Sequence, residues 1–463
     1  MKRPAVGRAP WLALVPLVGL IGLVILPALG HSSTVDAPES PHAAETGANG
    51  YVYTITPLSD GKFLIGGEFT EVLGLTRNRI ARLTSTGALD ETFNANANSD
   101  VRSIVVESGG QITFAGDFTS VGGIAQNRLA RVDATGLVDP TFNNGLAGPD
   151  GRVHVIVRQG DGKYLIGGTF LNVNGVSRAR IARLNSDGSL DTSFNPGGGV
   201  TGAFEDAVVH TIAVQADGKV LIGGTFDTVD GTARNHLARL NANGTLDAAF
   251  NAGVDSTVYR LQVLPDTTIV VGGFFGSIAG GARRRIARLK VDGTLQASFG
   301  GNDLGADQGL YTFRSAGAGY LIGGRFTEYN NPSSTTRNHL ARIDANGVLD
   351  PGCDPGVGPT ADPDVFDVAP LAGGNIVVGG PFKNFGGKAW LYYAVLDATC
   401  KALDPPADAT RTPSPTMSPS PTRTPSPTVT APAATASPTA TATATPVAAR
   451  PLYVPVASTQ HEG

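Results

Sequence analysis

Apolar residues in this chain cluster in one short sequence motif that recurs at regular intervals. The word "LIGGTF" occurs at residues 165–170 and 221–226, with near-copies at residues 64–69 and 321–326. Its closing aromatic residue recurs about every fifty residues, at Phe69, Phe118, Phe170, Phe226, Phe275, Phe326 and Phe382. A period of this length predicts a solenoid, a propeller or an array, built here from seven units.

Each unit divides into four short strand candidates. In residues 208–251 these are "HTIAV", "KVLIGGTF", "HLARL" and "TLDAAF". "ADGK" separates the first two candidates and "NANGT" the last two, and Asp-Gly and Asn-Gly between apolar runs are strong hairpin signals. Seven such units predict an all-β chain, a seven-bladed β-propeller of four-stranded antiparallel blades. An open array is less favoured, because each unit would leave two apolar faces exposed.

The glycine pair lies in the middle of a predicted strand, where glycine normally weakens the strand. Its repetition indicates that neighbouring blades pack too closely there for a Cβ atom. We therefore interpret "LIGG" and the aromatic residue after it as core, with no chemistry of their own.

The connections between the candidates divide into two classes. If the strands alternate in direction, the two tight turns of each unit share one face of the disk, and the long, variable connections share the other. Loops on a rigid scaffold often carry recognition. The long-connection face is therefore the predicted binding surface.

Both ends of the chain differ from the repeats. Lys2, Arg3 and Arg8 precede an apolar run at residues 11–29, which is typical of a cleaved export signal or an uncleaved anchor. The tail is almost entirely Thr, Pro, Ser and Ala and cannot bury a core. The predicted organisation is a signal peptide or anchor at 1–30, a flexible linker at 31–50, the propeller at 51–404, a disordered stalk at 405–450 and a short segment at 451–463.

Composition and charge narrow the function. The 463 residues include 61 glycines, which disfavour long helices, and the net charge of −4 gives no basis for nucleic-acid binding. With the export signal, this predicts an extracellular or cell-surface protein. We expect a monomer.

The compound motif resembles the delta-60 repeat family of secreted bacterial β-propellers. The matching words are "DGKxLIGGxF", "RNxLARL" and "DGxLDxxFN", and they extend over residues 51–404. The resemblance implies a propeller on an exported or surface protein and implies no enzymatic activity, because the family has no shared catalytic motif. The seventh unit departs from the pattern, since "AWLYYAVLD" replaces "NHLARLN".

Arginines recur in the third strand candidate and aspartates in the fourth, almost in step. A ring of arginines could face an anionic ligand such as an acidic glycan, but Arg–Asp pairing within each blade is the favoured interpretation. Arginines in the long connections are better ligand candidates, and Arg283 and Arg284 lie in the densest basic stretch.

The acids of the long connections are Glu205, Asp206, Asp303, Asp307, Asp362 and Asp364, and of these Asp303, Asp307 and Asp362 are the other ligand candidates. Such oxygen-rich loops could hold Ca²⁺, although none matches a complete calcium-binding pattern. Paired acids could also serve a glycosidase, but no spacing selects a pair. No metal-binding or nucleophile motif occurs, so no metal site, catalytic residue or cofactor is predicted.

Cys353 and Cys400 are the only cysteines and lie in adjacent units. In an oxidising compartment they could form a disulfide, or they could both be buried apolar residues. The favoured function is a non-enzymatic surface module for binding or adhesion, with a glycan or another surface protein as its partner. A secreted carbohydrate-active enzyme and a purely structural envelope protein are the alternatives.

Overall fold

The computed structural model describes residues 46–202, 207–300, 304–331, 333–360 and 362–406, which all fall in one compact unit. The predicted signal or anchor at 1–30, most of the linker and nearly all of the stalk and tail lie outside the described residues. No helix long and apolar enough to cross a membrane occurs in the described part.

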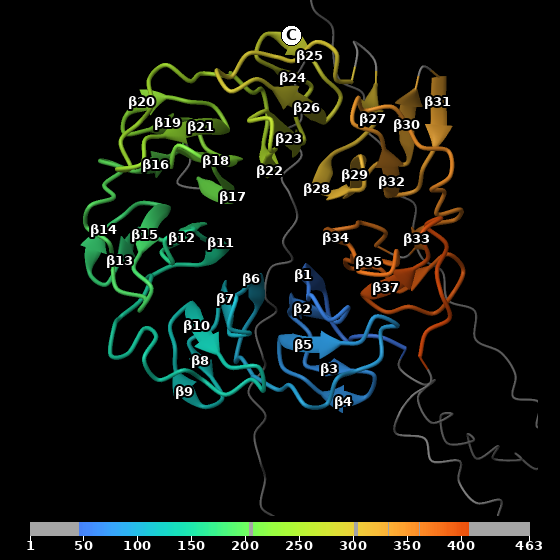
Figure 1. Cartoon of the computed structure of the whole chain (residues 1–463), viewed down its shortest axis with the longest axis horizontal. Helices are drawn as coiled ribbons and strands as arrows, with labels where there is room; N and C mark the ends of the chain where they lie inside the picture. Colours follow the sequence, from blue (N-terminus) through green and yellow to red (C-terminus); the bar gives the residue numbers. More distant parts are fainter. Residues whose placement is uncertain (1–45, 203–206, 301–303, 332, 361, 407–463) are drawn as a thin grey trace, which may run out of the picture. The chain divides into compact units, whose positions relative to one another are not determined.

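Three-stranded antiparallel sheets of one topology repeat along the described chain (Figure 1), and in each the second strand pairs with the other two. Nine such sheets are present in the described ranges, and two of them belong to the long connections described below. The other seven form the main repeat: β1 (Val52–Pro57), β2 (Phe63–Gly67) and β5 (Ile80–Leu83); β6 (Val101–Val106), β7 (Ile112–Gly116) and β10 (Leu129–Val132); β11 (Val153–Arg158), β12 (Tyr164–Gly168) and β15 (Ile181–Leu184); β17 (Val208–Val214), β18 (Val220–Thr225) and β21 (Leu237–Leu240); β22 (Val258–Val263), β23 (Ile269–Gly273) and β26 (Ile286–Leu289); β28 (Leu310–Ala316), β29 (Gly319–Gly324) and β32 (Leu340–Ile343); β34 (Asp367–Pro370), β35 (Ile376–Gly379) and β37 (Tyr393–Leu396).

These sheets follow one another around a ring (Figure 1), and the first strand of each lies nearest the centre. We call β1, β6, β11, β17, β22, β28 and β34 the inner strands. The ring is closed, because Ile55 N donates a hydrogen bond to Asp367 Oδ2 at 2.8 Å and Tyr393 Oη donates to Gly87 O at 2.9 Å. One apolar core cluster also joins side chains of the first and last repeats.

The fourth strand predicted for each unit is not a paired strand. Its residues form one isolated bridge to the third strand in every repeat, such as Leu240 with Leu246. The reason is visible at Asp247, whose side chain accepts a hydrogen bond from Ala249 N while Phe250 N donates to Asp247 O. This turn ends the pairing after a single residue, so the sheets have three strands instead of four.

The long connections form a second, smaller layer of structure. Each second-to-third-strand connection folds back on itself, and the linker from the preceding repeat pairs with it, as Val200 pairs with Val229 and Ala97 with Val121. The strands concerned are β3 (Glu71–Val72), β4 (Leu75–Thr76), β8 (Ser120–Val121), β9 (Ile124–Ala125), β13 (Asn172–Val173), β14 (Val176–Ser177), β16 (Val200–Thr201), β19 (Thr228–Val229), β20 (Thr232–Ala233), β24 (Ser277–Ile278), β25 (Gly281–Ala282), β27 (Gly305–Ala306), β30 (Glu328–Asn331), β31 (Ser333–Thr336), β33 (Pro359–Thr360) and β36 (Asn384–Phe385).

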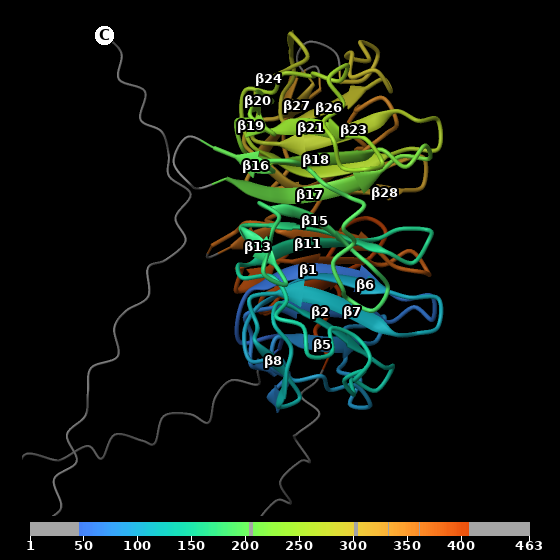
Figure 2. The same ribbon diagram turned by 90° about the vertical axis from the view of Figure 1, so that its left-hand side faces the viewer.

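This pairing confirms that the two classes of long connection share one face. Figure 2 shows β13, β16, β19, β20 and β24 along one side of the unit. We call it the hairpin face and the opposite side, with the tight turns, the turn face. The first linker also belongs to this layer: Ala48 is fully buried, bridges Val72 and donates its N–H to Leu391 O at 3.0 Å. The folded region therefore begins before residue 51.

The repeated glycines have two separate steric roles. A Cβ on the first glycine would meet the neighbouring sheet, since at Gly223 it would lie 2.6 Å from Val258 Cγ1. A Cβ on the second would meet the backbone of its own sheet, since at Gly224 it would overlap the Val208 carbonyl. The predicted close packing between neighbouring units is thus confirmed for the first glycine.

The seventh repeat forms the same sheet despite its different sequence. Trp390 is fully buried and its Nε1 donates to Leu403 O at 2.8 Å, while Tyr393 packs against Phe63 of the first repeat. These large side chains fill the space that smaller residues occupy elsewhere.

Candidate functional site

The arginines of the third strands belong to the scaffold. Arg82 Nε lies 2.8 Å from Asp90 Oδ2, which also pairs with Lys62 Nζ at 2.7 Å, and Arg82 Nη1 donates to Ala134 O of the next repeat. The same Arg–Asp pair recurs at Arg131–Asp139, Arg183–Asp191, Arg239–Asp247 and Arg342–Asp350. Pairing within the repeat, the favoured interpretation, is confirmed.

The two predicted arginine ligands are in different environments. Arg283 is buried and its Nη1 donates to Ala282 O at 2.7 Å. The equivalent arginines make the same bond to the preceding carbonyl, so Arg283 occupies a repeated structural position; they are Arg77, Arg178, Arg234 and Arg337. Arg284 is exposed, and its backbone bridges Gly305.

The predicted acids do not converge. Asp303 lies outside the described residues. Asp307 Oδ1 accepts backbone hydrogen bonds from Thr327 at 3.0 Å and Glu328 at 3.1 Å, which stabilise the hairpin. Asn49, Asn98 and Asp150 make the same pair of bonds in other repeats, so Asp307 also has a repeated structural role.

Asp362 is exposed on the linker of the seventh repeat, with a φ of 62°. No group of three or more His, Cys, Asp or Glu side chains suited to a metal ion occurs in the described part of the chain. Cys353 and Cys400 form a disulfide with a Cα–Cα distance of 5.0 Å, and it links the last two repeats.

A different set of side chains converges on the axis of the ring. The register between first and second strands slips by one residue near the start of six of the inner strands, as between Val52 and Thr54. Such a β-bulge re-aims the skipped side chain. We call the skipped residues, with their equivalent in the seventh repeat, the axial ring: Tyr53, Arg102, His154, His210, Tyr259, Tyr311 and Phe366.

The axial ring is held together by contacts between aromatic side chains of successive repeats. The ring centroids of His154 and His210 are 5.3 Å apart, those of His210 and Tyr259 4.8 Å, and those of Tyr259 and Tyr311 5.2 Å. Phe366 continues the series to Tyr311 at 5.3 Å and to Tyr53 at 6.0 Å. The Arg102 guanidinium lies 4.6 Å from the centroid of Tyr53.

Charges around the axial ring are arranged asymmetrically. Arg102 is paired with Asp100 at 3.0 Å and Asp117 at 3.3 Å. Burial lowers the pKa of His210 to about 4 and that of His154 well below its usual value, and nearby arginines add to both shifts. Both imidazoles are therefore neutral at pH 7.

Carboxylates border the ring where the inner strands leave the hairpin face. Tyr53 Oη donates to Glu68 Oε2 at 2.9 Å, and Tyr311 Oη donates to Asp364 Oδ2 at 3.3 Å. Tyr51 packs against Tyr53, Phe366 and Tyr392 at the same end. Burial raises the pKa of Asp364, and burial followed by the charge of Asp362 raises that of Tyr51.

Sequence reasoning missed the axial ring, although a signal was present. One position in every unit carries an aromatic, His or Arg side chain, but alternation in a strand does not show that a bulge turns it toward the axis. The candidates that the sequence predicts lie in the longest and most charged connections instead.

Six segments match a family model described as a domain of unknown function (DUF5122) beta-propeller, at residues 58–93, 108–142, 159–194, 215–250, 264–299 and 320–352. These segments are similar to the repeats of that β-propeller family. Each begins after an inner strand, so the axial ring lies outside the matched residues. No curated protein matches the chain.

Several solved structures are similar to this chain at low sequence identity. The WD40 beta propeller domain of Doa1 is 14% identical, with a TM-score of 0.47, and the match covers 73% of this chain and 92% of that one. The extracellular domain of a one component system from B. thetaiotaomicron is 13% identical, with a TM-score of 0.45 and coverages of 77% and 40%. Virginiamycin B lyase from Staphylococcus aureus is 15% identical, with a TM-score of 0.41 and coverages of 66% and 86%.

Proposed function

We propose that this chain is an exported, non-enzymatic, seven-bladed β-propeller that binds a glycan at the centre of its hairpin face. The seven repeated sheets support the blade number. The basic and apolar N-terminal segment supports export, and the Thr/Pro-rich tail would act as a stalk. We expect the protein to act as a monomer.

The observation that carries this proposal is the aromatic surface formed by the axial ring and Tyr51. Five aromatic side chains, Tyr51, Tyr53, Tyr259, Tyr311 and Phe366, meet there in an unbroken series of ring contacts, and all are half-buried. Aromatic side chains of the core are covered completely by other side chains, whereas these five lie along the axis and stay partly exposed.

The chemistry of this surface suits a sugar. The C–H face of a pyranose is apolar and packs on aromatic rings, while its hydroxyls donate hydrogen bonds to carboxylates such as Glu68 and Asp364. Binding sites of this kind combine an apolar lining with a few polar groups that fix orientation. Another surface protein is the second kind of partner that an aromatic patch would fit.

The hydrogen bonds that the carboxylates of this face already accept favour a binding role over catalysis. Asp307 is occupied by backbone N–H groups, and Glu68 and Asp364 accept hydrogen bonds from tyrosines of the ring. A glycosidase would need two carboxyl groups, one on each side of a bound sugar. The acids here border one aromatic surface instead.

A glycan array with the whole chain tests the proposal. We expect selective binding that falls at least about tenfold in Tyr51→Ala, because an aromatic anchor at the centre of an interface carries much of the binding energy. Leu137→Ala is the matched control, because Leu137 is 69% exposed on a turn of the turn face. It should bind like the parent.

Equal melting temperatures of the two variants would show that a loss of binding is not a loss of fold. Unchanged glycan binding by Tyr51→Ala would contradict the site. Release of a shortened sugar from the bound glycan would favour the enzyme alternative, and no binding to any glycan would favour a protein partner or a structural role.

A further inference from the structure

Three charged side chains that break the repeat pattern lie close together on the inner strands of the last three repeats. The residue after each axial-ring residue is small or aliphatic in five repeats: Thr54, Ser103, Val155, Thr211 and Thr312. The fifth and seventh repeats carry Arg260 and Asp367 instead. Two residues further along, the sixth repeat carries Arg314 where the first and third have Thr56 and Val157.

Asp367 has a structural role and is fully engaged. Its Oδ2 accepts from Ile55 N at 2.8 Å and Arg314 Nη2 at 3.0 Å, and its Oδ1 accepts from Thr312 Oγ1 at 2.9 Å. In another repeat a hydroxyl accepts the corresponding backbone hydrogen bond, since Leu261 N donates to Thr211 Oγ1 at 3.1 Å. Asp367 therefore has little capacity left for a second arginine.

Arg260 has no such role. Within the described ranges its guanidinium makes no hydrogen bond or ion pair, and Arg314 Nε is buried without a partner. Burial, with the charge of Arg314, lowers the pKa of Arg260 to about 10, although Asp367 acts in the opposite direction. Arg260 stays protonated at neutral pH, so two cations and one carboxylate leave a net positive charge.

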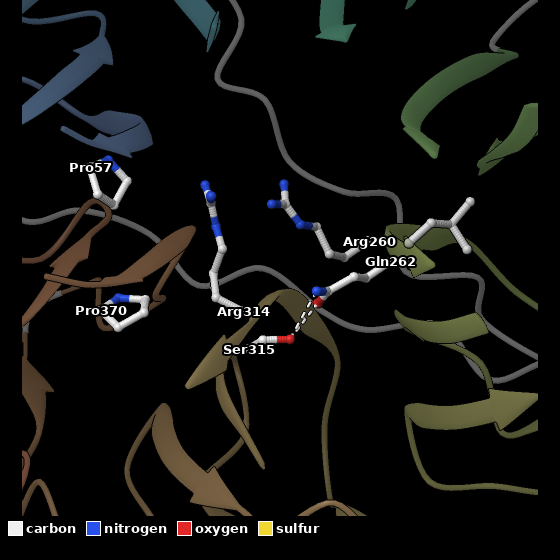
Figure 3. Close-up of a pocket in the computed structure, with 7 residues that line it drawn as sticks. Pro57, Arg260, Gln262, Arg314, Ser315 and Pro370 are labelled. Atoms are coloured by element: carbon white, nitrogen blue, oxygen red, sulfur yellow. Dashed lines mark hydrogen bonds between the residues drawn. The ribbon is translucent and has the colours of Figure 1, made fainter. Parts of the chain in front are cut away.

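Both guanidinium groups border one cavity on the axis. It encloses about 380 Å³ and is lined by Pro57, Arg260, Leu261, Gln262, Arg314, Ser315 and Pro370. Figure 3 shows the Arg260 and Arg314 side chains extending in the same direction. Gln262 Nε2 donates to Ser315 Oγ at 2.8 Å beside them, where these inner strands end at the turn face.

Arg260 and Arg314 are half-buried, and an anion bound between two such like charges would offset their repulsion. Guanidinium groups bind carboxylate and phosphate oxygens through paired, planar hydrogen bonds. We propose that this axial cavity binds a small ligand through its carboxylate or phosphate oxygens, held by Arg260 and Arg314. The site lies toward the opposite end of the axis from the proposed glycan surface and does not depend on it.

Isothermal titration calorimetry on the whole chain tests the site with sodium glucuronate and inorganic phosphate as probes. Glucose serves as the neutral counterpart of glucuronate, and ionic strength is held constant. We expect one binding event with at least one of the two anions and none with glucose. Which anion binds distinguishes a carboxylate from a phosphate ligand.

Arg260→Thr should weaken this binding at least about tenfold, because it removes one partner of a charge-assisted contact. Threonine is native at this position in three other repeats, so the variant should melt at or above the parent temperature. Arg158→Thr is the matched control, since Arg158 lies at the end of another inner strand and pairs with Glu107 at 3.6 Å. Failure of both anions to bind, or equal affinity in Arg260→Thr, would overturn the proposal.

Discussion

The outer part of each repeat and its inner strand differ in how closely they follow the repeat pattern. Outside, Lys62, Arg82 and Asp90 form a charge cluster that recurs with nearly the same distances in the third and fourth repeats, and its Arg–Asp pair also recurs in the second and sixth. Inside, successive repeats place Tyr53, Arg102 and other unlike side chains at one equivalent position. The matched family segments cover the outer part and stop short of the inner strands.

Repetition within this chain therefore marks the residues that build the scaffold. The Arg–Asp contact of the outer part is made in the same way in five repeats. Side chains on the axis do not take part in these repeated contacts, so they can differ from one repeat to the next. Departures from the repeat are therefore better guides to function here than the repeated charges.

The sharpest test of the scaffold is the second glycine of the pair. Gly224→Ala should lower the free energy of unfolding by about 3 kcal/mol or more, because the new methyl group would overlap the Val208 carbonyl, which is backbone and cannot rotate away. Urea unfolding measures the effect.

Gly223→Ala is the matched comparison and should cost about 1 kcal/mol. Its methyl group would meet side chains, 2.6 Å from Val258 Cγ1 and 2.8 Å from Thr211 Cγ2. The second repeat already has Ala115 at this position, fully buried. Equal costs for the two variants would contradict the assignment of separate steric roles.

Disrupting the Lys–Asp–Arg charge cluster should cause the next largest loss of stability. Asp247→Asn should cost about 2 kcal/mol, because Lys219 and Arg239 lose their shared counter-ion. In the fifth repeat Gln296 replaces this acid, and Arg288 pairs with Asp266 instead. Gln296→Ala should therefore change stability by less than about 0.5 kcal/mol.

The effect of Asp247→Asn should depend on pH. Burial raises the pKa of Asp247, but the hydrogen bonds from Lys219 and Arg239 outweigh it, so the pKa lies below its ordinary value. Its contribution is present above the unfolded pKa of about 3.9 and is lost as pH falls through the lower, folded value. Urea unfolding at pH 7 and near pH 3 should show the gap between parent and variant shrinking in acid.

The smallest expected changes in stability are those at Thr211 and Arg260, which occupy equivalent positions on two inner strands. Thr211→Val should cost about 1 kcal/mol, because it leaves the buried N–H of Leu261 without its hydroxyl acceptor. Arg260→Thr should cost nothing, or stabilise the ligand-free protein slightly, because it removes an unpartnered charge. A larger loss in Arg260→Thr than in Thr211→Val, measured by thermal unfolding, would show that Arg260 is structural.

Much of the architecture was readable from the chain. The period of Phe69, Phe118 and Phe170 predicted the repeats, the turn words predicted the antiparallel pairing, and the alternation of strands placed the long connections on one face. These features depend on local chain geometry and on the apolar pattern, which a sequence carries directly. The fourth strand was predicted wrongly, because the Asp247 side chain ends the pairing with a local turn.

The repeats follow from the sequence alone, and so does the regular spacing of the arginines and aspartates that pair within them. Which side chains meet on the axis depends on the folded ring, because residues such as Ile55 and Asp367 are 312 positions apart and come together when the ring closes. The folded structure also shows that Arg283 and Asp307 stabilise hairpins, while Arg260 borders a cavity. Strand alternation gives the face of a residue within its own sheet, but closure and the bulge determine what that face meets.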